Sequence, residues 1–291
     1  MPFVVSRRSF LLTSGALAVA ACSSGSKSKA TPPTTVRPKW NLVGLFAADA
    51  LAAGTKARLP FSIADADGGI PSTPPVTSLT VDVIDAAGKT VSSGVAVAAH
   101  SEGLPRAYFP VELNAATAGI YTVRSNIEGT TVEQAVQIGD GGTIPRPGQP
   151  MIPFDTPTTA DPRGVDLLCT RKPACPLHDV TLTQALAEQR PVAFLISTPL
   201  YCQVGICGPV LDLLVAAQAE HPQVRFLHSE VYPSEAAAQP GKEQTVPVVA
   251  AYGLTFEPVL FLATPDGKVQ RRLDTIFDAS ELRSALTALV R

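Results

Sequence analysis

The segment from Pro191 to Leu214, PVAFLISTPLYCQVGICGPVLDLL, constrains the fold more than any other part of the chain. It opens with an apolar run, Val192–Ile196, which is typical of a strand buried on both faces. Two cysteines follow, Cys202 and Cys207, and a Gly-Pro step then suits the first turn of a helix. The sequence therefore predicts two thiols between a buried strand and a helix N-terminus, where the helix dipole favours a thiolate.

This order of strand, cysteine pair, Gly-Pro and helix resembles the active-site segment of the thioredoxin superfamily. The match continues downstream, where Glu257 and Pro258 precede a second apolar strand, Val259–Ala263. In thioredoxin-like folds a cis-proline at the start of that strand faces the cysteine pair, and Pro258 matches it. The resemblance implies an α/β thioredoxin-like domain over residues 164–291, with Cys202, Cys207 and Pro258 as its catalytic residues.

The chain departs from the thioredoxin pattern around the two cysteines. The family motif is C-x-x-C after a Trp, whereas this chain has C-x4-C after Tyr201, and Ile196 stands where thioredoxins carry a buried acid. A second alignment places Cys207 on the first cysteine of the motif and Val210 on the second, with Cys202 supplied from a loop. Both alignments remain open, and either cysteine is a candidate nucleophile.

Residues 1–21 have the features of an export signal. Ser6–Leu11 matches the twin-arginine pattern, and the apolar core that follows is too short for a permanent membrane span. Val19–Cys22 resembles the bacterial lipobox, which implies that Cys22 is lipidated. We expect a protein anchored by lipid to the extracytoplasmic face of the cell membrane, although an ordinary signal peptide or a membrane anchor would also fit.

The rest of the N-terminal half divides into three parts. Residues 22–39 are rich in Ser, Thr, Lys and Pro and predict a flexible tether. Residues 40–139 contain short alternating strands separated by turns, and the run around Tyr121 resembles the tyrosine corner of immunoglobulin-like sandwiches. Residues 140–163 contain six prolines and predict a semi-rigid linker. The predicted fold class is therefore an all-β immunoglobulin-like sandwich followed by the thioredoxin-like domain.

Two further cysteines, Cys169 and Cys175, lie at the start of the C-terminal domain. With Cys22 assigned to lipid, four cysteines remain in an exported domain, and their simplest pairing joins neighbours in the sequence. We expect a structural disulfide between Cys169 and Cys175. The alternative is a second redox pair that exchanges electrons with Cys202 and Cys207.

Two histidines raise the question of a metal. SCO-type copper chaperones are also thioredoxin-like and bind copper through a C-x3-C pair and a distant His. Here the spacing of Cys202 and Cys207 is one residue longer, and His178 and His228 are the available imidazoles. We expect His178 to have a capping or surface role and His228 to be a hydrogen-bonded sheet residue, so no metal and no cofactor are predicted.

The expected function is thiol–disulfide exchange on exported proteins with thiols or disulfides. The alternatives are a non-catalytic interaction module stapled by disulfides, or an SCO-like copper-binding protein. The formal net charge is −2 and basic residues do not cluster, which argues against nucleic acid as a partner.

Overall fold

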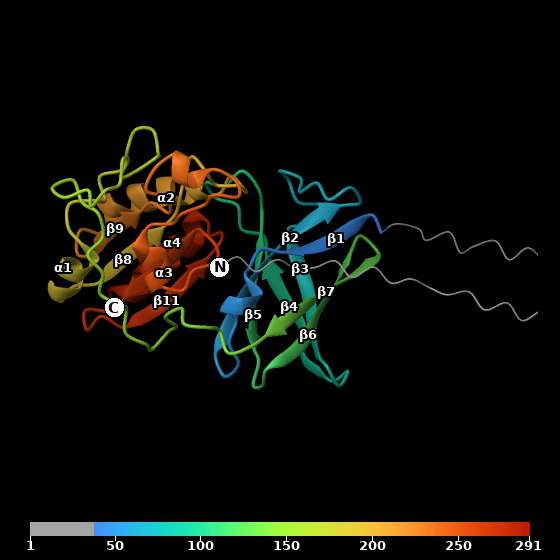
Figure 1. Ribbon diagram of the computed structural model, residues 1–291. Coiled ribbons are helices and arrows are strands. Elements are labelled where there is room, and N and C mark those ends of the chain that lie inside the picture. Colours follow the sequence, from blue (N-terminus) through green and yellow to red (C-terminus); the bar gives the residue numbers. More distant parts are fainter. Residues whose placement is uncertain (1–37) are drawn as a thin grey trace, which may run out of the picture. The chain divides into compact units, whose positions relative to one another are not determined.

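A computed structural model describes residues 38–291. The predicted signal segment 1–21, the lipidation site Cys22 and nearly all of the tether 22–39 lie outside the described residues. The described residues belong to one compact unit, which contains three β-sheets and four α-helices among its elements (Figure 1).

The N-terminal part is a sandwich of two antiparallel sheets. One sheet has the order β1 (Trp40–Gly44), β2 (Lys56–Asp65), β5 (Phe109–Asn114), and a short 3-10 turn, η1 (Ala48–Ala50), follows β1. The other has the order β4 (Thr90–Ala98), β3 (Ser78–Asp85), β6 (Gly119–Ile127), β7 (Thr130–Ile138). Alternate residues of β3, β5, β6 and β7 are buried, because successive side chains of a strand point to opposite faces. The shared core includes Leu59, Phe61, Ile63, Leu79, Val81, Val83 and Val123.

A tyrosine corner closes one end of β6. The hydroxyl of Tyr121 donates a hydrogen bond to the carbonyl oxygen of Thr117, with 2.9 Å between the two oxygens. This is the local contact that the sequence predicted around Tyr121. Together with the two packed sheets, it is consistent with an immunoglobulin-like sandwich.

The C-terminal part is built on one mixed sheet. Its strand order is β11 (Val269–Asp274), β10 (Val259–Ala263), β8 (Val192–Ile196), β9 (Arg225–Ser229). β8 and β9 are parallel, whereas β10 is antiparallel to both β8 and β11. Every residue of β8 and β10 is buried, as their uninterrupted apolar runs predict.

Helices cover both faces of this sheet. Ala193 and Leu195 of β8 share a core with α2 (Cys207–Glu220) and α4 (Ala279–Leu289). Phe194 and Ile196, which point the other way, share a core with α1 (Leu182–Ala187) and α3 (Pro247–Ala251). A 3-10 turn, η2 (Ala236–Ala238), lies between β9 and α3.

The proline-rich segment 140–163 differs from the linker that its composition predicted. Its backbone lies along the outer edge of β11, where Gly148 N–H donates to the carbonyl of Val269 at 2.8 Å and Val269 N–H donates to Gln149 at 2.8 Å. Ile144 and Met151 are buried in the core on the α1 and α3 side of the sheet. The segment is packed because its few apolar side chains reach that core and its backbone completes a sheet edge.

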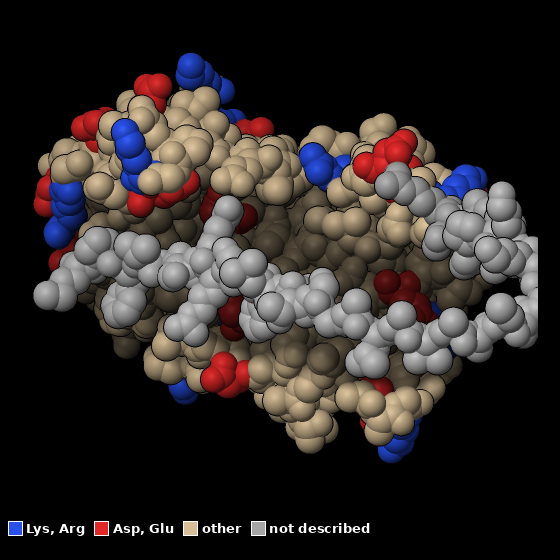
Figure 2. Space-filling view, turned by 45° about the vertical axis from the view of Figure 1, so that its right-hand side comes forward, with Lys and Arg blue, Asp and Glu red and all other residues tan. Residues whose placement is uncertain are grey.

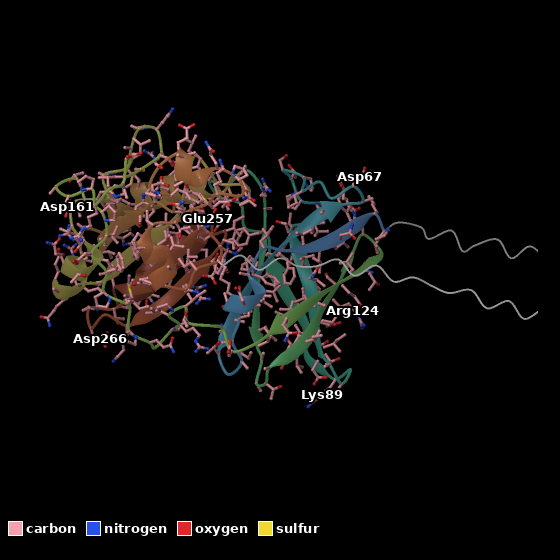
Figure 3. All side chains as sticks on the ribbon, viewed as in Figure 1. Asp67, Lys89, Arg124, Asp161, Glu257 and Asp266 are labelled. Carbon is pink, nitrogen blue, oxygen red and sulfur yellow. The ribbon has the colours of Figure 1, made fainter. Side chains whose placement is uncertain are left out.

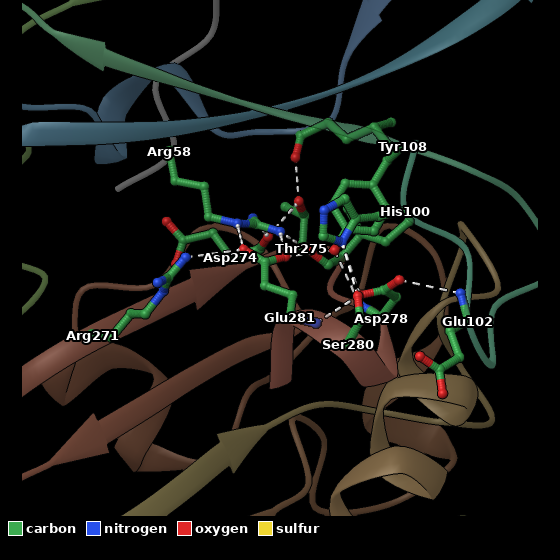
Figure 4. A network of polar contacts seen from close by, with 12 residues as sticks. Arg58, His100, Glu102, Tyr108, Arg271, Asp274, Thr275, Asp278, Ser280 and Glu281 are labelled. Atoms are coloured by element: carbon green, nitrogen blue, oxygen red, sulfur yellow. Dashed lines mark hydrogen bonds and ion pairs between the residues drawn. The ribbon is translucent and has the colours of Figure 1, made fainter. Parts of the chain in front are cut away.

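A buried polar network joins the sandwich to the mixed sheet (Figure 4). The guanidinium of Arg58 in β2 donates to both carboxylate oxygens of Glu281 in α4, each at 2.6 Å. Burial disfavours the ionised form of Glu281, but the charge and hydrogen bonds of Arg58 lower its pKa overall. A bidentate pair of this kind fixes the relative orientation of the two side chains.

The described surface is mixed in charge, with acidic and basic side chains interspersed on the face shown in Figure 2. Between residues 38 and 291, no helix is both long enough and apolar enough to cross a membrane.

Candidate functional site: two cysteine pairs

Cys202 and Cys207 lie where β8 passes into α2, as predicted. Cys207 is the first residue of α2 and its side chain is fully buried, whereas Cys202 lies in the preceding loop and is partly exposed. The backbone N–H of Cys207 donates to Sγ of Cys202 over 3.3 Å. This arrangement agrees with the alignment in which Cys207 stands at the helix start and Cys202 is supplied from a loop.

The two thiols differ strongly in acidity. A hydrogen bond from the Cys207 thiol, together with backbone N–H groups of the loop, lowers the pKa of Cys202 to about 5. The hydrogen bond to the Cys202 thiolate and burial raise the pKa of Cys207. Near neutral pH the pair therefore holds a thiolate at the accessible sulfur and a proton at the buried one.

The start of β10 lies at the same end of the sheet as the C-terminal end of β8, from which the cysteine loop continues. Val259 is paired with Ile196, the last residue of β8, so Pro258 stands beside the chain as it leaves β8. The Glu257–Pro258 peptide bond is cis, as the resemblance implied. Burial and the negative charge of Cys202 raise the pKa of Glu257, which is labelled in Figure 3.

Exposed apolar side chains lie two residues before and two residues after Cys202 in the sequence. Leu200 is 56% exposed and Val204 is 51% exposed, both in the loop that carries Cys202.

The second pair, Cys169 and Cys175, lies in a different environment from the one that the sequence predicted. All four described cysteines are free thiols, so the predicted Cys169–Cys175 disulfide is not formed in this structure. The two sulfurs share a buried cluster with His178 and His228, and the four possible ligand atoms all lie within 4.8 Å of one another.

This cluster corrects the role expected for His178, whereas His228 is the hydrogen-bonded sheet residue that was expected, with its Nε2 3.0 Å from the hydroxyl of Ser197. His178 does not cap α1 with its side chain, since Thr181 and Gln184 do so. Its Nε2 lies 3.2 Å from Sγ of Cys175, and Nδ1 of His228 lies 3.5 Å from the same sulfur. The histidines therefore accompany Cys169 and Cys175, and not Cys202 and Cys207 as the SCO-like alternative required.

The two sulfurs of this cluster also differ in pKa. A hydrogen bond from the Cys175 thiol lowers the pKa of Cys169. The same hydrogen bond and burial raise the pKa of Cys175, and burial lowers the pKa of His178.

Sequence reasoning missed the cluster because His228 is distant in the chain. The local signal is a C-x5-C-x2-H run ending at His178. The contact that adds His228 is a backbone hydrogen bond from its N–H to the carbonyl of Leu177, 3.0 Å long. That bond places the Cys-His segment against β9, and no spacing rule in the sequence indicates it.

Thr170 connects the two cysteine pairs. Its hydroxyl accepts a hydrogen bond from the backbone N–H of Leu200, two residues before Cys202, over 3.0 Å. The same hydroxyl donates to Oε1 of the buried Glu230 at 2.6 Å. The residue after Cys169 thus supports the loop that carries Cys202.

A separate pocket of about 500 Å³ lies between the proline-rich segment and the start of α3. Phe154, Val165 and Pro247 contribute to its lining. Neither Cys202 nor Cys207 reaches it, so its size alone does not make it the reaction site.

No protein-family model matches the chain. No curated protein matches it. Among solved structures, the crystal structure of the Lin-41 filamin domain is 18% identical, with a TM-score of 0.25, covering 36% of this chain and 95% of that one. The crystal structure of a conjugative transposon lipoprotein from Bacteroides eggerthii is 10% identical, with a TM-score of 0.22, and the match covers 35% of this chain and 98% of that one. At these TM-scores neither likeness bears on the function.

Proposed function

We propose that the C-terminal part is a thioredoxin-like α/β domain and that it carries out thiol–disulfide exchange through Cys202 and Cys207. One observation carries the proposal: the partly exposed Cys202 sulfur accepts a hydrogen bond from the N–H of Cys207 at the start of α2, which lowers the pKa of Cys202, whereas the sulfur of Cys207 is buried and its pKa is raised. The attacking species in exchange is the thiolate, so this asymmetry assigns Cys202 as the nucleophile and Cys207 as the resolving thiol.

The reaction follows from that assignment. The Cys202 thiolate attacks one sulfur of a substrate disulfide, forming a mixed disulfide and releasing the other substrate sulfur as a thiolate. Cys207 then loses its proton and attacks Sγ of Cys202, which releases the second substrate thiolate and leaves a Cys202–Cys207 disulfide. Two electrons pass to the substrate, and a dithiol reductant returns the pair to its starting state.

Neighbouring groups support this chemistry. Burial and the charge of Cys202 raise the pKa of Glu257, whose charge also acts on Cys207, so this carboxyl group is the candidate that exchanges protons with the pair. Leu200 and Val204 offer apolar contacts to the chain on either side of a substrate disulfide. Pro258, beside the end of β8, is the third residue of the proposed site.

Trapping of the mixed disulfide tests the roles of the two cysteines. In Cys207→Ser the nucleophile remains and the resolving thiol is lost, so incubation with a disulfide-bonded protein such as insulin should accumulate a covalent adduct at Cys202. In Cys202→Ser the remaining thiol is buried, and little adduct should form. Non-reducing electrophoresis and peptide mass spectrometry measure the amount of adduct formed by each of the two variants. Reductase activity of either variant should fall to background.

Cys22→Ser is the matched control, because it removes a thiol that belongs to neither of the two described pairs. It should retain the activity of the unaltered chain if its fold, checked by circular dichroism, is intact. Full activity in both Cys202→Ser and Cys207→Ser would overturn the proposal, and equal trapping by the two variants would overturn the assignment of roles.

We further propose that the protein acts from the outer face of the cell membrane, anchored through lipid at Cys22, on exported proteins with thiols or disulfides. The proposal rests on the lipobox-like run at Val19–Cys22. Metabolic labelling with a palmitate analogue should mark the unaltered chain and not Cys22→Ser. Equal labelling of both would contradict the anchor and leave the exchange chemistry untouched.

A further inference from the structure

We propose that Cys169, Cys175, His178 and His228 form a binding site for one zinc ion. The four side chains are all buried and each offers one ligand atom to a common centre. The site is separate from the exchange reaction proposed for Cys202 and Cys207, and the two proposals can fail independently.

The spacing of the ligand atoms fits tetrahedral coordination. Zn–S bonds of about 2.3 Å and Zn–N bonds of about 2.0–2.1 Å place neighbouring ligand atoms of a tetrahedron about 3.3–3.8 Å apart. The separation is 3.2 Å from Cys175 Sγ to His178 Nε2 and 3.5 Å from Cys175 Sγ to His228 Nδ1. The two histidine nitrogens are 3.4 Å apart. An ion can thus enter the centre with little movement of these side chains.

A hydrogen bond outside the cluster orients His228 for coordination. Its Nε2 lies 3.1 Å from the carbonyl oxygen of Ser197 and 3.0 Å from the hydroxyl of the same residue. A carbonyl oxygen only accepts, so Nε2 carries the proton and Nδ1 presents its lone pair to the cluster. Zinc-binding histidines usually have such an acceptor on the ring nitrogen that faces away from the metal.

The chemistry of the donor set favours zinc among divalent ions. Two thiolates with two imidazoles in a tetrahedron are a structural zinc set, and hard cations such as Mg²⁺ prefer oxygen ligands. Coordination requires both sulfurs as thiolates, so any thiol proton of the pair is released to solvent, and the two negative charges balance the charge of the ion.

Two hollows lie beside the cluster. A small cavity of about 10 Å³ borders His178, His228 and Glu230. It shares Pro157, Val165 and Val246 with the lining of the 500 Å³ pocket. Oε2 of Glu230 is buried and has no hydrogen-bond partner among the described residues, and a buried polar atom of this kind points to an additional bound species nearby.

Cobalt and zinc titrations of the reduced full-length chain test the site. Co²⁺ should bind one ion per chain and give the d–d bands of a tetrahedral complex with a thiolate-to-metal band in the near ultraviolet. Zn²⁺ should displace it and raise the thermal unfolding temperature. Cys175→Ser and His228→Gln should each weaken Zn²⁺ binding at least about 100-fold, since each removes a ligand.

Two matched variants serve as controls. The double variant Cys202→Ser/Cys207→Ser also removes two thiols, and His221→Gln also removes a histidine; both should bind Co²⁺ and Zn²⁺ like the unaltered chain. If Cys175→Ser or His228→Gln does not fold, alkylation of the unaltered chain with and without Zn²⁺ still tests the zinc site. Zn²⁺ should protect Cys169 and Cys175 from iodoacetamide while Cys202 stays reactive.

Three results would overturn the proposal. They are the absence of tetrahedral Co²⁺ bands in the reduced chain, the loss of these bands in the Cys202→Ser/Cys207→Ser variant, and alkylation of Cys169 and Cys175 that is unaffected by Zn²⁺.

Discussion

The four described cysteines have the same side chain and very different surroundings. Cys202 is partly exposed and receives hydrogen bonds from a helix start, a setting that stabilises a reactive thiolate. Cys169 and Cys175 are buried beside two imidazoles, a setting that suits metal coordination. Reactivity in this protein is therefore decided by what each sulfur contacts, since the spacing of the two pairs in the sequence is nearly the same.

The acidity of Cys202 gives a prediction at the scale of one residue. Alkylation of Cys202 should depend on pH with a midpoint near the pKa of about 5. Cys207→Ala removes the largest cause of this low pKa, so the midpoint should move upward while the backbone donors keep it below the value of about 8.5 typical of a free thiol. Mass-spectrometric alkylation rates at Cys202, measured from acid to neutral pH, provide the test.

A free Cys peptide of the loop sequence is the reference for that titration. If Cys202 in the folded chain titrates like the peptide, the helix start does not lower its pKa and the nucleophile is misassigned. An unchanged midpoint in Cys207→Ala would show that the backbone donors alone are responsible.

The sequence could predict Cys202 and Cys207 as a site, but not the cluster of Cys169 with the histidines. The first pair depends on local sequence, because an apolar run, two cysteines and a Gly-Pro step in one segment predict a strand, a loop and a helix start. The second depends on the pairing of the segment before α1 with β9, a tertiary contact. His228 in isolation has the pattern of an ordinary sheet residue, and only its neighbours give it another role.

At the scale of elements, burial patterns determined how much could be predicted. The apolar runs of β8 and β10 are fully buried, and the alternating run of β6 has alternating burial, as their compositions indicate. The proline-rich segment 140–163 could not be placed in the same way. Proline content reports on backbone stiffness, and it says nothing about whether Ile144 and Met151 will find a core to fill.

Helix α4 shows how an element takes part in more than one contact. Its N-cap residue, Asp278, accepts a hydrogen bond from the N–H of Glu281 at 2.8 Å, as the capping pattern in the sequence indicates. The same carboxylate accepts from the backbone N–H of Glu102 at 3.2 Å, in the segment between β4 and β5. The cap is predictable from local sequence; its second partner, from the other half of the chain, is not.

At the scale of the whole molecule, the contact between the sandwich and the mixed sheet contains a titratable pair, His100 and Asp278. His100 Nδ1 lies 3.0 Å from a carboxylate oxygen of Asp278, and this hydrogen bond raises the pKa of His100. Glu281, Arg58 and the hydroxyl of Ser280 also face or influence this imidazole. Burial works against ionisation of Asp278, but His100 and the α4 backbone lower its pKa to about 2 overall.

The pair should therefore stabilise the fold most between about pH 4 and about pH 6.5, the ordinary pKa values of Asp and His. The contribution of His100 is lost as the pH rises through its raised pKa, and that of Asp278 is lost as the pH falls toward about 2. His100→Gln should remove the loss on the alkaline side, an effect of at most about 1 kcal/mol for a partly exposed pair.

Chemical denaturation of the unaltered chain and of His100→Gln at pH 6 and pH 9 measures this difference. His221→Gln is the matched control and should keep the pH dependence of the unaltered chain. An identical pH dependence in all three proteins would show that His100 and Asp278 do not strengthen the contact.

The backbone segments along the mixed sheet have a consequence for self-association. Val269 at the start of β11 is hydrogen-bonded on the outer edge of the sheet to Gly148 and Gln149, and His228 on the outer edge of β9 is bonded to Leu177. A strand with free backbone groups is a template for addition of further chains and so for fibre growth. At these two positions an incoming strand would first have to displace a segment of the protein itself, so we expect them to resist extension of the sheet by a further chain.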